Sequence, residues 1–198
     1  MKKVSKKTLY NKYFKRLLDI ITSFIGIVIL LPVYLLIMLL IIIIDKNTPI
    51  YLQRRTGLQG KEFNIIKFQT FKYDDITKLG SFLRQTSLDE IPQFINVLIG
   101  QMSIVGPRPW IPDYYQRFNE YEKKRVTVRP GIVGLAQVNG RNKLNIFQKI
   151  EYDLEYIKKI SLKEDLKIII RSLKVIVSKE ENEEPDTYIR NELMELER

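Results

Sequence analysis

A long apolar run near the N-terminus constrains this chain more than any other feature of its sequence. It extends from Leu17 to Ile44, and Asp19 is its only charged residue. At ~1.5 Å per residue, a helix of this length is longer than the ~30 Å hydrocarbon core of a bilayer is thick. The run therefore predicts a helix that contacts lipid, with the other residues folded beside it.

Pro32 and the flanking charges indicate how such a helix would lie in a membrane. A proline inside a helix removes a backbone hydrogen bond and forces a kink. Lys and Arg collect on the cytoplasmic side of membrane segments, and this run is basic at both ends. We therefore predict a re-entrant segment that turns at Pro32 and leaves on the side where it entered. A kinked spanning helix is the alternative, because spanning helices tolerate proline. The flanking basic residues are Lys2, Lys3, Lys6, Lys7, Lys12, Lys15 and Arg16 before the run, and Lys46, Arg54, Arg55 and Lys61 after it.

The composition limits the chemistry that the chain can perform. Its 198 residues include no cysteine and no histidine, which excludes disulfides, thiolate chemistry, Ser-His-Asp hydrolysis and the usual zinc sites. Carboxylates, lysines, arginines, hydroxyls and a hard cation remain as catalytic groups. The formal net charge is +10, although the segment after Ser178 is acidic. We expect anionic membrane lipids and phosphorylated substrates as partners, and nucleic acid is the weaker alternative.

The pattern along the chain predicts an α+β fold that is mostly helical. We expect a basic N-terminus with a membrane helix over residues 1–45, a cytoplasmic catalytic domain over 46–178 and an acidic tail over 179–198. Extended segments at 50–52 and 63–66 flank a turn at 57–60, which predicts a β-hairpin. Further helices are expected over residues 79–85, 111–125, 147–160 and 166–177. The last of these is basic and amphipathic, so it fits either the membrane interface or the surface of a soluble core.

Asp89 and Glu90 form the best candidate for a reactive pair. Proline lacks an N–H and fits only among the first three positions of a helix, so Pro92 predicts a helix with its N-cap at residues 89–91. Asp89 is the best chemical match for that cap. One interpretation is therefore that the two acids only cap a helix.

Basic residues at rigid turns support a second interpretation of the same pair. Arg108 lies between two prolines, which suits it to hold a phosphate with both arms of its guanidinium. A cavity that handles phosphate would suit a carboxylate nucleophile at phosphorus, with a neighbouring carboxylate that holds Mg²⁺. The other basic candidates are Lys67 at the end of a predicted strand, Arg84 one helical turn before the pair, and Arg129 and Arg141 at glycine turns.

Several segments in fixed order resemble the signatures of the bacterial sugar transferase family, the small monotopic polyprenol-phosphate phosphoglycosyl transferases. The longest are SLDEIPQ at 87–93, MSIVGPRP at 102–109 and RPGIVGLAQVNGRN at 129–142. Shorter matches lie at 15–19, 53–57 and 63–68. The resemblance extends over residues 10–178.

The resemblance implies a re-entrant membrane helix broken at Pro32 and an active site on the cytoplasmic face of the bacterial inner membrane. It implies transfer of a sugar-1-phosphate from a nucleoside diphosphate sugar, expected to be a UDP-sugar, to undecaprenyl phosphate, with release of UMP. This is the first membrane step of surface glycan synthesis. A homodimer is compatible with it. By position, Asp89 would form a phospho-sugar intermediate, Glu90 would bind Mg²⁺, Arg84 and Arg108 would hold phosphate, and Lys67, Arg129 and Arg141 would be further contacts.

The chain departs from the family pattern in a few places. Leu31 stands where a serine often precedes the helix-breaking proline, Gln69 replaces a basic residue, and the stretch 71–79 is short. Two other functions are alternatives to the enzyme. One is a membrane-anchored scaffold in which Asp89 and Glu90 only cap a helix. The other is a nucleic-acid-binding protein, which is disfavoured because the basic residues lie at turns rather than along one helical stripe.

Overall fold

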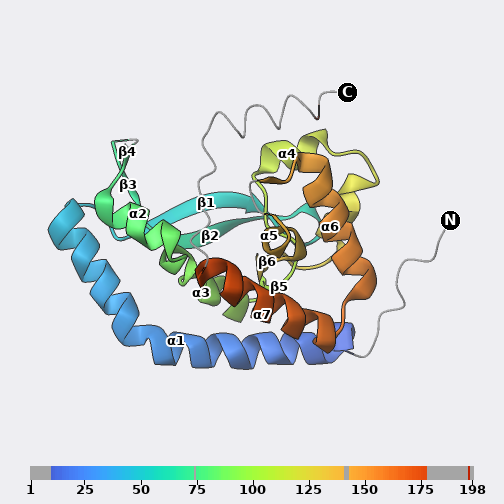
Figure 1. Cartoon of the computed structure of the whole chain (residues 1–198), viewed down its shortest axis with the longest axis horizontal. Helices are drawn as coiled ribbons and strands as arrows, with labels where there is room; N and C mark the ends of the chain where they lie inside the picture. Colours follow the sequence, from blue (N-terminus) through green and yellow to red (C-terminus); the bar gives the residue numbers. More distant parts are fainter. Residues whose placement is uncertain (1–9, 74, 141–142, 178–195, 197–198) are drawn as a thin grey trace.

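One long helix runs along a side of the molecule, and the other elements lie on top of it (Figure 1). The computed structural model describes residues 10–73, 75–140, 143–177 and 196. Helix α1 spans Lys15–Leu40 and is extended by π-helical turns at Tyr10–Phe14 and Ile41–Asp45. Pro32 lies inside α1, and Figure 1 shows two arms of this helix that meet at a bend. A proline inside a helix accounts for such a bend, and the predicted long helix is confirmed.

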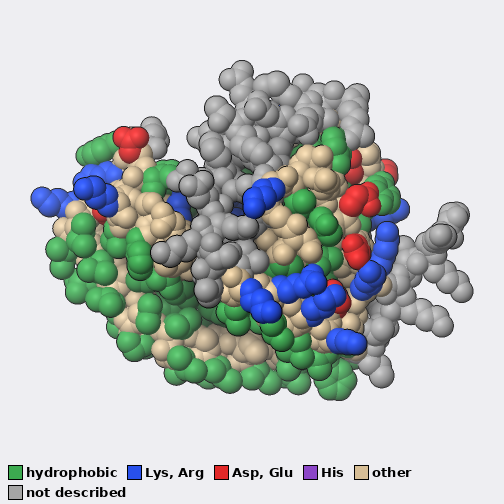
Figure 2. All heavy atoms as spheres, in the orientation of Figure 1, with side chains coloured by type: hydrophobic (Ala, Val, Ile, Leu, Met, Phe, Trp, Pro, Cys, Tyr) green, Lys and Arg blue, Asp and Glu red, His purple; other side chains and the backbone are tan. Residues whose placement is uncertain are grey.

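One face of α1 packs on the rest of the protein. Its buried residues include Tyr34 and Ile37, which are three apart, and Ile41 continues the face four residues later, beyond α1. The Tyr34 hydroxyl donates a hydrogen bond of 2.5 Å to the Ile91 carbonyl, and its ring lies edge-on to Phe68. The opposite face is exposed and apolar, and Figure 2 shows hydrophobic side chains gathered along that edge of the molecule. By length and composition, the helix over 15–45 could cross a membrane.

Within the described residues, the strands form three small sheets of two strands each. Strands β1 (Ile50–Thr56) and β2 (Glu62–Phe68) are antiparallel, so the predicted hairpin is confirmed. Strands β3 (Phe71–Lys72) and β4 (Asp75–Ile76) form a minimal second hairpin. Strands β5 (Ser103–Val105) and β6 (Gly131–Val133) pair in parallel, which the sequence did not predict. These small sheets among many helices fit the expected α+β class.

Short helices connect the sheets, and two longer helices follow them. They are α2 (Lys78–Gln85), α3 (Gln93–Leu98), α4 (Pro112–Arg117), α5 (Leu135–Val138), α6 (Ile146–Lys159) and α7 (Leu162–Val177). The helices expected over 79–85 and 147–160 are confirmed within a residue. The last helix begins four residues earlier than expected.

The helix expected over residues 111–125 is not continuous. Helix α4 ends at Arg117, Phe118 adopts an extended conformation, and a separate 3₁₀ turn spans Glu122–Thr127. Phe118 is buried in an aromatic cluster with Trp110. The Asn119 side chain accepts hydrogen bonds from two backbone N–H groups at the start of the new turn. Burial of Phe118 and capping by Asn119 explain the break.

Candidate active site

Asp89 and Glu90 lie in a 3₁₀ turn, Leu88–Glu90, between α2 and α3. Ser87 begins this turn with a left-handed backbone (φ 57°), a conformation that costs a residue other than glycine ~1–3 kcal/mol. Helix α3 begins at Gln93, Pro92 occupies its N-cap position, and no side chain caps it. The N-cap expected at 89–91 is therefore wrong, because the chain enters α3 through a 3₁₀ turn. Asp89 does not cap this helix.

Two basic side chains contact the acidic pair from separate elements. Lys67, near the end of β2, places its Nζ 2.8 Å from Glu90 Oε1 and 3.8 Å from Asp89 Oδ2. Arg108, in the loop after β5, places Nη2 3.3 Å from the same Glu90 oxygen. Asp89 is buried, with 7% of its surface exposed. The structure thus brings four of the predicted site residues together.

Arg84 is the third basic residue near the pair. It lies in the last turn of α2, where its Nε donates to the Thr70 hydroxyl at 3.1 Å. Its guanidinium lies 4.2 Å from the centre of the Phe71 ring. Its charge also favours the ionised form of Asp89. Arg84 is therefore close enough to help hold an anion beside Asp89.

The two carboxyl groups differ in their proton affinity. Burial raises the pKa of Asp89 to about 6, although Lys67, Arg84 and Arg108 oppose this rise, and the neighbouring Glu90 charge adds to it. Burial also raises the pKa of Glu90, but Lys67 and Arg108 outweigh burial and hold that pKa below its ordinary range. Adjacent carboxyl groups with separated pKa values suit different chemical roles.

The acidic pair has the right chemistry for Mg²⁺. No group of three or more acidic side chains that could form a dedicated metal cage is found in the described parts of the chain. Mg²⁺ usually binds through one or two carboxylates together with substrate phosphates, which matches a site with two adjacent carboxylates. Glu90 fits this role because its environment keeps it ionised.

The remaining predicted phosphate contacts are Arg129 and Arg141, and the structure describes only the first of them. Arg129 donates through Nε to the Gly100 carbonyl at 2.9 Å, just beyond the C-terminus of α3. Arg16 binds the last carbonyls of the same helix, so both arginines stabilise its C-terminal end. This position, at the opposite end of α3 from Asp89, does not support Arg129 as a phosphate contact. Arg141 lies outside the described residues.

Sequence reasoning missed two supporting contacts. Asp19 Oδ1 accepts hydrogen bonds from the Ser103 hydroxyl at 3.0 Å and the Ile104 N–H at 2.9 Å, which ties α1 to β5. The sequence did contain a sign that Asp19 has a buried partner, because Asp19 is the only acid in the apolar run. Arg125 is buried and bound to Asp153, and it also donates a hydrogen bond to the Arg108 carbonyl. No local pattern marked Arg125, because its partner lies on a different helix.

Comparison with known proteins decides the family. The bacterial sugar transferase family matches residues 10–179. This chain belongs to that family. One relative is the UDP-glucose:undecaprenyl-phosphate glucose-1-phosphate transferase of Klebsiella pneumoniae. It is 41% identical over an alignment of 181 residues, and the match covers 80% of this chain and 39% of that protein. The galactosyl transferase CpsE of Streptococcus agalactiae serotype III is 38% identical over 191 residues, which cover 82% of this chain and 42% of the relative.

A relative of more similar length is the uncharacterized sugar transferase EpsL of Bacillus subtilis. It is 36% identical to this sugar transferase over 178 residues, which cover 83% of this chain and 88% of EpsL. By contrast, the chain spans about two-fifths of the length of the Klebsiella and Streptococcus relatives. The family match, over residues 10–179, includes the segments that supply Asp89, Glu90 and Arg108.

Proposed function

We propose that this sugar transferase moves a sugar-1-phosphate from a nucleoside diphosphate sugar, expected to be a UDP-sugar, to undecaprenyl phosphate. The products are undecaprenyl-diphosphate-sugar and UMP. The observation that carries this proposal is the buried Asp89–Glu90 pair, surrounded by Lys67, Arg84 and Arg108. The Klebsiella relative supports the substrate class, because its name specifies transfer of glucose-1-phosphate to undecaprenyl phosphate.

The reaction has two displacement steps at one phosphorus atom. In the first, the ionised Asp89 carboxylate attacks the phosphorus that bears the sugar, and the bond from this phosphorus to the bridging oxygen breaks. UMP leaves with that oxygen. In the second, an oxygen of undecaprenyl phosphate attacks the same phosphorus and releases Asp89. Covalent catalysis by a carboxylate divides one difficult transfer into two easier ones.

The neighbouring side chains have separate tasks in this mechanism. Arg108 and Arg84 offset the negative charge on the phosphates, and Lys67 favours the ionised form of Asp89. Glu90, with the substrate phosphates, would hold Mg²⁺, which supplies further charge neutralisation at phosphorus. The low proton affinity of Glu90 keeps it available as a ligand near neutral pH.

The proposal also includes a re-entrant position for α1 at the cytoplasmic face of the bacterial inner membrane. Both ends of the helix are tied to the same body. At the N-terminal end, Lys15 and Tyr10 each contact the buried Asp165 of α7 at 2.6 Å. At the C-terminal end, Asp45 Oδ2 accepts a hydrogen bond of 2.8 Å from the Thr77 hydroxyl next to α2. These contacts favour a helix that bends back over one that crosses the bilayer.

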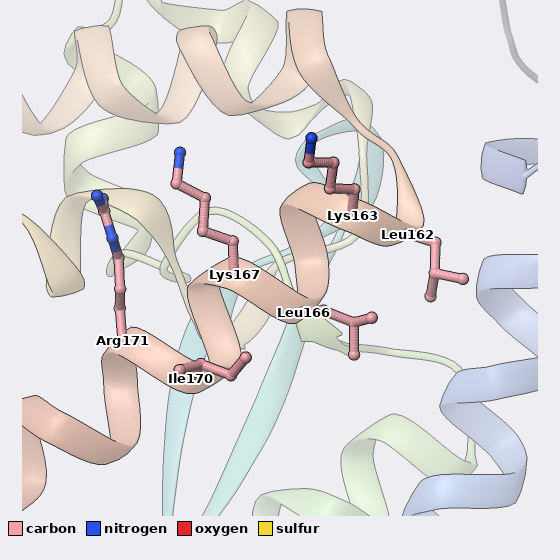
Figure 3. Close-up of a pocket in the computed structure, with 6 residues that line it drawn as sticks. All are labelled: Leu162, Lys163, Leu166, Lys167, Ile170 and Arg171. Carbon is pink, nitrogen blue, oxygen red and sulfur yellow. The ribbon is translucent and has the colours of Figure 1, made fainter.

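Helix α7 supports attachment to anionic lipids beside α1. The apolar side chains of Leu162, Leu166 and Ile170 point to one side of this helix, and three basic side chains point to another side (Figure 3). Both sets line one shallow hollow. The basic side chains are Lys163, Lys167 and Arg171. All three apolar residues are exposed, which fits insertion into the acyl boundary with the basic groups at headgroup level.

An Asp89→Asn variant tests the function. The asparagine side chain keeps the shape of Asp89 but cannot form the phospho-sugar ester. We expect it to abolish transfer of radiolabelled sugar to lipid while it leaves attachment to membranes unchanged. Arg54→Gln, which alters an exposed arginine of β1, serves as the matched control and should retain activity. Normal turnover by Asp89→Asn would rule out the mechanism. If the wild-type protein released no UMP in the presence of Mg²⁺ and donor, the alternative of a non-catalytic scaffold would hold instead.

A further inference from the structure

The loop that presents Arg108 is held by an unusual set of contacts. This Arg108 loop, residues 106–110, joins β5 to α4. Its successive carbonyl oxygens from 107 to 110 each accept a hydrogen bond from another segment. The donors are Gly131 N–H to Pro107 at 2.9 Å, Arg125 to Arg108 at 2.8 Å, Arg55 to Pro109 at 3.3 Å, and Thr56 N–H to Trp110 at 2.8 Å. Arg125 is the buried charged side chain among these donors, and it binds the residue whose side chain enters the active site.

Arg125 is fixed from several directions at once. Its Nε and Nη2 donate to the same Oδ2 oxygen of Asp153 in α6, at 3.1 and 2.5 Å, while Nη2 also reaches the Arg108 carbonyl. The guanidinium carbon lies 4.0 Å from the centre of the Trp110 ring. Arg125 and Asp153 are 3% and 2% exposed. A guanidinium this constrained holds the atom that it binds in one place.

We propose that Arg125 is a positioning residue for the active site, which acts through the backbone of Arg108 and is itself held by Asp153. Its guanidinium fixes the Arg108 backbone, and this aims the Arg108 side chain at Glu90 and at the phosphates that the site would bind. The proposal rests on the function proposed above.

The geometry explains why the position of this loop matters to the chemistry. Arg108 Nη2 lies 3.3 Å from Glu90 Oε1, so a small movement of the backbone would break that contact. Misplacement by about 1 Å can cost an enzyme ~100-fold in rate. Loss of Arg125 should therefore loosen the hold of Arg108 on the phosphates and lower the rate.

A double-mutant cycle with Arg108 tests the proposal in the full-length protein. With a UDP-sugar, undecaprenyl phosphate and Mg²⁺, we expect Arg125→Ala to lower kcat/KM by ~100-fold. In an Arg108→Ala background, the same change should cost less than about twofold, because its target is already gone. Losses that multiply in the double variant would overturn the proposal. Arg54→Gln is the control arginine, and an inactive wild-type protein would instead refute the proposed function.

Two further measurements separate positioning from a general loss of folding. KM for the UDP-sugar should rise in Arg125→Ala, as in Arg108→Ala, whereas a defect that only reduces the amount of folded enzyme would lower the apparent kcat and leave KM unchanged. Hydrogen exchange of the 106–110 segment should accelerate without donor present, while β1 and β2 remain protected. If Arg125→Ala fails to fold, Arg125→Lys keeps the charge but lacks the planar guanidinium, and the same rise in KM is expected. An unchanged KM and unchanged hydrogen exchange would refute the role.

Discussion

Removal of the Lys67 charge should shift the pH dependence of the enzyme in a defined direction. Lys67 Nζ lies 3.8 Å from Asp89 Oδ2, and its charge lowers the pKa of Asp89. At an effective dielectric constant of ~20, unit charges ~4 Å apart interact by ~4 kcal/mol, which is an upper bound here because Lys67 also binds Glu90. Opposite charges at such distances lower a carboxyl pKa by ~1–3.

We therefore expect Lys67→Met to raise the pKa of Asp89 from about 6 to ~7 or higher. The ionised fraction of this nucleophile at pH 7 would fall from ~90% to half or less. The measurement is the pH dependence of kcat/KM for UMP release. Its acid limb should rise through pH ~6 in the wild type and through a higher pH in the variant, because the proposed mechanism requires the ionised form of Asp89.

Two matched variants define the outcome for Lys67. Lys67→Arg keeps the positive charge, so its acid limb should remain close to that of the wild type. Lys61→Met removes a charge from the exposed end of the β1–β2 hairpin and should leave the profile unchanged. An acid limb that stays in place in Lys67→Met, or that moves to lower pH, would refute the electrostatic reasoning.

Three further predictions concern the metal, the packing of α1 and the lipid. EDTA should abolish UMP release and Mg²⁺ should restore it, with Glu90→Gln requiring more Mg²⁺ for half-maximal rate; equal Mg²⁺ dependence would argue against Glu90 as a ligand. Tyr34→Phe should cost ~0.5–1.5 kcal/mol of stability in thermal unfolding, because the Ile91 carbonyl loses this hydrogen bond and keeps only the one from the Phe94 N–H; an unchanged midpoint would contradict this. Replacement of Lys163, Lys167 and Arg171 by Gln should weaken binding to anionic vesicles by ~1 kcal/mol per charge, and no salt-dependent change would refute the role of α7.

The motifs along the chain were sufficient to predict residues that the structure brings together around Asp89. Asp89 and Glu90 could be found because two acids stand just before a proline, and Arg108 because prolines flank it on both sides. The structure places Lys67 and Arg108 against Glu90, although its contacts do not test the roles assigned to them. The residue types and their neighbouring prolines in these segments are therefore enough to identify candidate residues without a structure.

The contacts that hold the site were beyond sequence reasoning for a physical reason. Arg125 and Asp153 lie on different elements, and so do Lys15 and Asp165, so no local periodicity links either pair. The face of α1 that packs on the protein could not be identified either, because nearly every residue of that run is apolar. Tyr34 can be assigned to this face only from its hydrogen bond to the Ile91 carbonyl, which is far away in the sequence.

The most direct measurement is mass spectrometry of the wild-type protein after rapid acid quench with Mg²⁺ and a competent UDP-sugar, without undecaprenyl phosphate. We expect release of about one UMP per enzyme and a peptide spanning residues 87–93 that is heavier by one sugar phosphate, with the added mass on Asp89. Asp89→Asn should show neither. A sugar phosphate on a different side chain, or UMP release only when the lipid acceptor is present and without any covalent species, would contradict Asp89 as the nucleophile.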